Sequence, residues 1–187
     1  MPDAQVQLTW SRIARRIRVP LGFALAAVYI WRSRPTWTSL GAGVSIALVG
    51  LVLRALAAGH IRKDRELTST GPYAFVRNPL YLGSIILGAG FAIAARDIWI
   101  AVCMVALFLL IYVPVIRSEE AFLRQQFQEY DDYAKGVPVL IPTKIRFREL
   151  TAGFSGALYL QHREYNALLG LAGMVAALVV KVIWLQK

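Results

Sequence analysis

The chain has 187 residues, of which 57% are hydrophobic and only 17% are charged, and its mean hydropathy is +0.52. This composition excludes an ordinary soluble domain and indicates an integral membrane protein. We expect no nucleic-acid partner despite the net charge of +10. In a multispan protein, excess Lys and Arg gather in cytoplasmic loops, where they contact anionic lipid headgroups.

Five apolar stretches follow one another and predict about five transmembrane helices, since a helix needs about 20 apolar residues to cross the hydrocarbon core. The second, fourth and fifth are long enough, and the third is short. The first is the weakest and is alternatively a re-entrant or interfacial helix. The stretches are Val19 to Trp31, Thr38 to Ala58, Pro79 to Ala95, Ile98 to Ile116, and Asn166 to Leu185. The expected fold is an all-α integral membrane domain over residues 1–187, with a cytoplasmic helical extension after the fourth span.

Loop charges predict the orientation of this multi-pass chain in the bilayer. With the N-terminus in the cytoplasm, 15 Lys and Arg residues fall on the cytoplasmic side and four fall outside. Positive loops favour the cytoplasmic side of a membrane. We therefore expect a cytoplasmic N-terminus and an external C-terminus.

Sequence motifs for several cofactor classes are missing. The single cysteine, Cys103, lies in an apolar stretch, so no disulfide or reactive thiolate is expected. The two histidines, His60 and His162, are too few for a His/Cys metal site, and we predict no metal. Neither GxGxxG nor a Walker A motif occurs, which excludes Rossmann and P-loop nucleotide sites. Any cofactor must be held by the membrane helices and their cytoplasmic extensions.

Two polar segments are candidates for a functional site: Gly59 to Asn78, and Arg117 to Pro142. The first runs into residues 67–83, LTSTGPYAFVRNPLYLG, where an arginine, an asparagine and a tyrosine surround Pro79 at a helix entrance. Crossing a bilayer does not require such residues there, so we expect the chemistry at this point.

The second segment predicts a helix that continues out of the fourth span and ends at Gly136 and Pro138. Glu119 and Glu120 lie near the membrane surface. The segment is either an interfacial amphipathic helix whose acids pair with nearby arginines, or part of the functional site. Two carboxylates this close to the bilayer favour the second interpretation, a functional site.

Two residues near the end of the second span allow two interpretations each. Arg54 lies four residues before the end of that span. In one interpretation its side chain snorkels to the membrane interface, which costs less free energy than a charge kept within the bilayer. In the other it lines a polar cavity, where it could orient an acidic substrate. His60 either faces a bound cofactor or lies in the headgroup layer.

The two segments together resemble the isoprenylcysteine carboxyl methyltransferases and the related membrane methyltransferases of phospholipids and small molecules. That family carries Gly-x-Tyr…Arg-His-Pro-x-Tyr-x-Gly and, one helical hairpin later, Glu-Glu…Phe-Gly-x-x-Tyr-x-x-Tyr…Val-Pro-x-x-Ile-Pro. The matching residues are Gly71, Tyr73, Arg77, Asn78, Pro79, Tyr81 and Gly83, then Glu119, Glu120, Leu123, Phe127, Tyr130, Tyr133, Val137, Pro138, Ile141 and Pro142. The resemblance covers residues 59–142, and the span over residues 166–185 is additional.

This chain departs from the family pattern at three points. Asn78 replaces the usual histidine, and an amide can form hydrogen bonds but cannot titrate. The spacing from Phe127 to the first tyrosine is one residue shorter and lacks its glycine. Gly136 stands where a basic residue often precedes Val-Pro in the family. The missing basic residue weakens the expectation that this chain acts on the family's prenyl-cysteine substrate.

The resemblance implies methyl transfer from S-adenosyl-L-methionine at the cytoplasmic face. It assigns Arg77 or Asn78 to the cofactor carboxylate, and Glu119 or Glu120 to its ammonium or ribose. Tyr73 and Tyr81 would form the pocket walls beside Pro79, and Leu67 would flank the adenine. Arg77 and Arg54 are the candidate catalytic residues, and His60 is a further candidate cofactor contact.

The acceptor is expected to be a small or lipid-like molecule that enters from the bilayer, with a carboxylate, thiol or amine as nucleophile. No residue stands out as the general base.

Two other functions remain possible from the sequence. One is an NADPH-dependent membrane reductase of the sterol reductase type, which shares part of the first motif but has many more spans. The other is a non-catalytic membrane scaffold, because the second and last spans carry faces of small residues that pack helices tightly. These faces are alternatively intramolecular contacts or the seam of a possible homodimer. They comprise Gly41, Gly43, Ser45, Ala47 and Gly50, and Ala167, Gly170, Gly173 and Ala177.

Overall fold

The computed structural model describes residues 24–62, 66–143 and 147–186. Its described residues form helices and connecting loops without a strand, which confirms the predicted all-α class. Three helical segments are long and apolar enough to cross a membrane, namely Trp37–Ala58, Ile98–Gln126 and Tyr165–Leu185. Helix α3 (Pro79–Ala95) is apolar but shorter. The chain is therefore a multi-pass integral membrane protein.

The first apolar stretch is described only in part. Residues 24–32 are helical, and the preceding residues of that stretch lie outside the described part of the chain. Whether this stretch crosses the membrane stays a prediction, as does the total of five spans.

Local capping signals determine where α2 (Trp37–Ala58), α3 and α4 (Ile98–Leu107) begin. Thr36 forms a capping box with Ser39 at the start of α2. Pro79 occupies the first turn of α3, where a missing N–H costs nothing. The Asp97 carboxylate accepts hydrogen bonds from the first backbone N–H groups of α4. Because Arg96, at φ 52°, and Asp97 alone separate α3 from α4, these two helices run antiparallel.

Helices α2 and α3 approach closely because glycines face each other at two levels. A Cβ added at Gly50 would lie 2.5 Å from the Gly83 oxygen, and one at Gly43 would lie 2.5 Å from the Gly90 oxygen. Such small residues allow two backbones to pack without side chains between them. The small-residue face of the second span is therefore used for intramolecular packing at these glycines.

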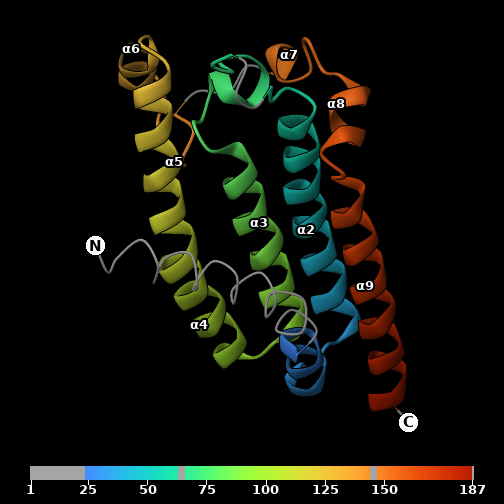
Figure 1. Cartoon of the computed structure of the whole chain (residues 1–187). Helices are drawn as coiled ribbons and strands as arrows, with labels where there is room; N and C mark the ends of the chain where they lie inside the picture. Colours follow the sequence, from blue (N-terminus) through green and yellow to red (C-terminus); the bar gives the residue numbers. More distant parts are fainter. Residues whose placement is uncertain (1–23, 63–65, 144–146, 187) are drawn as a thin grey trace.

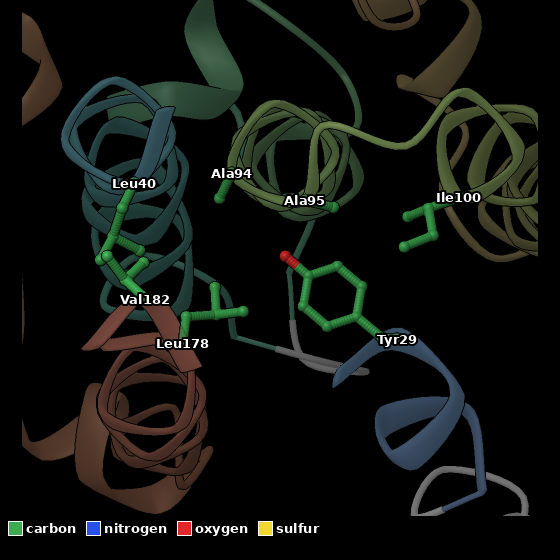
Figure 2. Packing of buried hydrophobic residues seen from close by; sticks show 7 residues of the cluster. All are labelled: Tyr29, Leu40, Ala94, Ala95, Ile100, Leu178 and Val182. Atoms are coloured by element: carbon green, nitrogen blue, oxygen red, sulfur yellow. The ribbon is translucent and has the colours of Figure 1, made fainter. Parts of the chain in front are cut away.

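A cluster of buried apolar residues joins the helices at the end of the bundle where α3 is followed by α4 (Figure 2). Tyr29 inserts its ring among the surrounding helices, and its hydroxyl donates to the Phe91 carbonyl at 2.8 Å. The other members come from α2, α3, α4 and α9 (Tyr165–Leu185). They are Leu40, Ala94, Ala95, Ile100, Leu178 and Val182. This cluster holds one end of the bundle together and leaves the other end to form a cavity.

One long helix carries the chain from the apolar cluster to the cavity end. It consists of α4, the π-helical turn η2 (Phe108–Tyr112) and α5 (Val113–Gln126). Pro114 lacks an N–H and its ring crowds the preceding turn, which accounts for the wider π turn just before it. Beyond this turn α5 stands apart from α3, whereas α2, α3 and α9 lie side by side (Figure 1).

Short helices cover the cavity end. The extension predicted after the fourth span is in two pieces, because the helix ends at Gln126 and resumes as α6 (Tyr130–Gly136) after an extended Phe127. A 3-10 turn, η1 (Gly71–Ala74), precedes α3. Helices α7 (Phe147–Leu150) and α8 (Gly156–Gln161) precede α9 (Figure 1).

Candidate active site at the end of the helix bundle

A cavity of about 760 Å³ opens between the helices at this end. Sites for small molecules typically measure about 300–1,000 Å³. Its lining comes from the end of α2, the loop that follows, η1, the start of α3, Tyr112, α5, α6 and the segment before α9. The cavity therefore combines both sequence segments that predicted a functional site.

Backbone pairing positions the residues before α3. Gly71 adopts a positive φ of 59°, and a Cβ there would also collide with the His60 ring. After this turn, the Arg77 N–H donates to the Pro138 carbonyl at 2.9 Å and the Asn78 N–H donates to the Val139 carbonyl at 3.2 Å. The two halves of the family-like motif are thus joined through their main chains.

The side chains of Arg77, Asn78 and Glu120 form the polar centre of the cavity. The Asn78 amide donates to Glu120 Oε1 at 3.2 Å, and Arg77 Nη1 lies 3.5 Å from the same oxygen. The Arg77 and Glu120 side chains are only 13% and 17% exposed. Ion pairs shielded from water in this way interact more strongly than surface pairs.

Three buried polar atoms near this centre have no hydrogen-bond partner within the described part of the chain: Tyr73 Oη, Arg77 Nε and Tyr130 Oη. Burial raises the pKa of Tyr73 well above its usual range, so this hydroxyl keeps its proton. By contrast, the Tyr133 hydroxyl donates to the Tyr73 carbonyl at 2.7 Å. Buried polar atoms are normally paired, and these three fit a ligand that brings hydrogen-bonding oxygens.

The structure brings most of the sequence-predicted residues to the cavity wall. Tyr81 stacks at an angle on Tyr112, with 5.3 Å between ring centroids, and interacts with Glu119. Of the candidate residues, those that line the cavity are Arg54, Leu67, Tyr73, Arg77, Asn78, Pro79, Tyr81, Glu119 and Glu120.

His60, the further candidate cofactor contact, is not among the residues that line the cavity. Its side chain is buried, with Nδ1 at 2.7 Å from the Leu56 carbonyl and Nε2 at 2.9 Å from the Ala152 carbonyl. Both ring nitrogens are thus taken up by main-chain oxygens. The ring ties the end of α2 to the segment before α8, and this contact was not visible in the sequence.

Arg54 lines the cavity. This placement agrees with the second of the two sequence interpretations and not with snorkelling to the membrane surface, which costs less free energy. Its Nε lies 2.5 Å from Glu164 Oε1, and its Nη1 donates to Ser84 Oγ and to the Leu80 carbonyl. Intramembrane arginines generally pair in this way or face a polar cavity.

Glu164 and His162 are among the cavity residues that the sequence motifs did not single out. Glu164 is 9% exposed, and His162 Nε2 lies 3.2 Å from the Ile61 carbonyl. Both belong to the polar run QHREY directly before the last apolar stretch. Ionisable residues at the entrance of a span were the available signal.

Each arginine that lines the cavity is paired with a glutamate. Besides the pairs of Arg54 and Arg77, Arg62 Nη1 lies 3.1 Å from Glu66 Oε1. Glu119 is the fourth lining glutamate and has no arginine partner among the described residues. With neutral histidine, the described lining therefore carries a formal charge of about −1, counted at neutral pH. No group of three or more His, Cys, Asp or Glu in the described part of the chain could hold a metal ion.

Comparison with known proteins agrees with the sequence motif. Residues 18–130 match the phospholipid methyltransferase family. The chain is 35% identical over 153 residues to the nickel-cobalt-cadmium resistance protein NccN of Alcaligenes xylosoxydans xylosoxydans, covering 78% of this chain and 68% of the relative. It is 34% identical over 139 residues to the cobalt-zinc-cadmium resistance protein CzcN of Cupriavidus metallidurans, covering 70% and 64%. The chain thus spans about two thirds of the length of these relatives. No solved structure matches it.

Proposed function

This chain belongs to the phospholipid methyltransferase family, and we propose that it transfers the methyl group of S-adenosyl-L-methionine to a small or lipid-like acceptor. The observation that carries the proposal is the cluster of Arg77, Asn78 and Glu120, which joins the entrance of α3 to α5 inside one cavity. This arrangement places donors and a carboxylate together, as a zwitterionic amino-acid group requires.

The cofactor has three polar parts that this cavity can hold. Arg77 or Asn78 would bind its carboxylate, and Glu119 or Glu120 would bind its ammonium or its ribose hydroxyls. Tyr73 would form part of the wall. The formal charge of the described lining, about −1, complements a cofactor that carries one net positive charge at neutral pH.

Further along the wall, Pro79 and Tyr81 line the cavity, and Leu67 would flank the adenine. Aromatic faces also stabilise a nearby cation such as a sulfonium. These residues complete a pocket with both polar and aromatic sides.

The bound cofactor supplies an activated methyl group, so the chain itself needs no covalent nucleophile. Its residues must align the acceptor with that group and exclude water. Arg77 and Arg54 are the proposed functional arginines, the first toward the cofactor and the second through its contact with Glu164. The side chains of both arginines lie in a largely buried part of the cavity wall. Because water is excluded there, transfer of the methyl group to an aligned acceptor is favoured over its transfer to water.

We propose that the acceptor enters from the bilayer and that the reaction occurs at the cytoplasmic face. Basic residues gather at the cavity end of the described bundle: Arg62 lines the cavity, and Arg117, Arg124 and Lys135 belong to α5 and α6, which also contribute to its lining. The positive-inside rule assigns such an end to the cytoplasm. A cavity between membrane helices is also accessible to amphiphiles.

The names of NccN and CzcN connect those relatives with resistance to nickel, cobalt, zinc and cadmium. For this chain we propose that any such role acts through the methylated product. Growth in cobalt or nickel of cells that express either the native chain or Arg77→Gln tests this proposal. Tolerance that survives the substitution would separate resistance from methyl transfer.

The cofactor class is tested by thermal unfolding of detergent-purified protein with S-adenosylhomocysteine or NADPH. A ligand that binds only the folded state must raise the apparent unfolding temperature. We expect a rise with S-adenosylhomocysteine alone. A rise with NADPH alone would instead support the reductase, and a response to neither would favour the scaffold.

A further inference from the structure

The contact between Arg54 and Glu164 forms a second polar centre in the cavity. Arg54 comes from α2, four residues before its end, and Glu164 immediately precedes α9. Glu164 Oε1 receives the Arg54 Nε hydrogen bond, and its Oε2 has no hydrogen-bond partner among the described residues. Because Glu164 lines the cavity, this second oxygen is available to accept a hydrogen bond from a bound molecule.

This centre lies in a part of the chain that the family match does not reach. The residues proposed for the cofactor all fall within residues 18–130, whereas Glu164 lies beyond them. Members of one methyltransferase family share the methyl donor and differ in the acceptor. A residue outside the matched segment that still lines the cavity is therefore better suited to the acceptor than to the cofactor.

The charge of the cavity argues against an anionic acceptor. The Arg54–Glu164 pair is formally neutral, and Arg77 and Arg62 are likewise neutralised by glutamates. With the cofactor bound, the charges of the described lining and the cofactor balance, so no surplus positive charge remains to attract a carboxylate. An approaching carboxylate would also face Glu164, which repels it.

We infer that Glu164 binds the acceptor by accepting a hydrogen bond from its nucleophilic atom, and that this nucleophile is an N–H, O–H or S–H group rather than a carboxylate. Arg54 is the positioning residue that fixes the Glu164 carboxylate. This inference rests on the proposed methyl transfer and narrows its acceptor class.

For an amine acceptor the step balances as follows. The nitrogen lone pair forms the new N–C bond to the methyl carbon while the S–C bond breaks, and sulfur keeps that electron pair as a neutral thioether. The methylated nitrogen then carries the positive charge as an ammonium that donates a hydrogen bond to Glu164, and its proton passes to water after the product leaves. A hydroxyl or thiol would instead lose its proton as the new bond forms, with Glu164 accepting it and passing it to water.

The type of methyl product tests the acceptor class directly. The full chain is reconstituted in vesicles of total lipid from the expression host and incubated with methyl-tritiated S-adenosylmethionine, with the host soluble extract as a second acceptor source. Mild base converts methyl esters into volatile methanol and leaves N-methyl, S-methyl and ether products intact. We expect base-stable label. Volatile label after base would overturn the inference, because it identifies a carboxylate acceptor.

Glu164→Gln tests the residue itself. Loss of a hydrogen bond to a charged group costs about 1.5–3 kcal/mol, so we expect the KM for the acceptor fraction to rise about tenfold or more. Affinity for S-adenosylhomocysteine should stay within about twofold. An equal loss of S-adenosylhomocysteine affinity would assign Glu164 to the cofactor and overturn the inference.

Two further variants protect this test from a folding defect. The double variant Arg54→Gln/Glu164→Gln removes both charges of this pair, so neither is left unpaired, and it should reproduce the rise in KM while it still binds S-adenosylhomocysteine. Glu129→Gln removes a charge at an exposed position outside the cavity and should leave both constants unchanged. Failure of native protein to bind S-adenosylhomocysteine would instead refute the proposed function.

Discussion

The Asn78 amide donates to Glu120 Oε1 at 3.2 Å, and this hydrogen bond joins residues 42 positions apart in the chain. Asn78 begins α3, and Glu120 lies in α5. Related membrane methyltransferases usually carry a histidine at the position of Asn78. An amide forms this contact without titrating, so the polar centre of the cavity keeps the same hydrogen-bonding pattern on this side across neutral pH.

Removal of the Arg77 charge should weaken cofactor binding strongly. Hydrogen bonds to charged groups contribute about 1.5–3 kcal/mol, so Arg77→Gln should raise the Kd for S-adenosylhomocysteine about 10- to 100-fold. Isothermal titration calorimetry measures this change. Arg124→Gln is the matched control, because Arg124 pairs with Asp131 on the exposed surface. Equal affinity in native protein and Arg77→Gln would remove Arg77 from the proposed site.

Tyr73→Phe should separate stability from binding. The Tyr73 hydroxyl is buried and has no partner among the described residues, and such a group costs about 1–3 kcal/mol. Its removal should raise the apparent unfolding temperature of the free protein and weaken S-adenosylhomocysteine binding. Tyr133→Phe removes the hydrogen bond to the Tyr73 carbonyl and should lower the unfolding temperature. A destabilised Tyr73→Phe protein would show that the hydroxyl has a partner.

The contact of α2 with α3 depends on Gly50. A Cβ there would lie 2.5 Å from the Gly83 oxygen and 2.6 Å from the Leu87 nitrogen, which are both backbone atoms. Gly50→Ala should therefore destabilise the fold by about 1–3 kcal/mol, as overpacking does. Gly88 in α3 has no atom within 4 Å of an added Cβ, and Gly88→Ala should stabilise by about 0.5–1 kcal/mol. Thermal unfolding in detergent measures both, and equal effects would contradict this packing.

The turn between α3 and α4 should lose stability in acid. The hydrogen bond from Arg32 lowers the pKa of Asp97 below its usual value. A lowered pKa means that the folded state favours the charged carboxylate, so this stabilisation is present above about pH 4 and disappears as the pH falls through the lowered pKa. The difference in unfolding temperature between native protein and Asp97→Asn should therefore shrink below about pH 4. A constant difference would contradict the coupling.

Cysteine labelling in intact cells tests the proposed orientation. In a Cys103→Ser background, Lys135→Cys reports on the cavity end and Arg34→Cys on the opposite end, and both positions are exposed. A membrane-impermeant maleimide should label Arg34→Cys in intact cells and label Lys135→Cys only after permeabilisation. The reverse pattern would place the cavity on the external side.

Local sequence features predicted the long helices and named most of the candidate residues that the structure brings to one cavity. Hydropathy and length identify the three long spans and the shorter α3, because a helix in lipid must satisfy its backbone internally and match the bilayer thickness. The order and spacing around Arg77 and Glu120 pointed to one cofactor site. The residues of this pattern lie within two short segments of the chain, so the pattern can be recognised without the tertiary structure.

The tertiary structure alone decided which ionisable groups meet. The sequence left both Arg54 and His60 between two interpretations and did not single out Glu164. The close α2–α3 contact and the return of the chain before α9 bring Arg54 to Glu164, while His60 turns toward main-chain oxygens. Composition and periodicity describe one helix at a time, whereas the partner of a buried charge depends on how helices distant in sequence pack together.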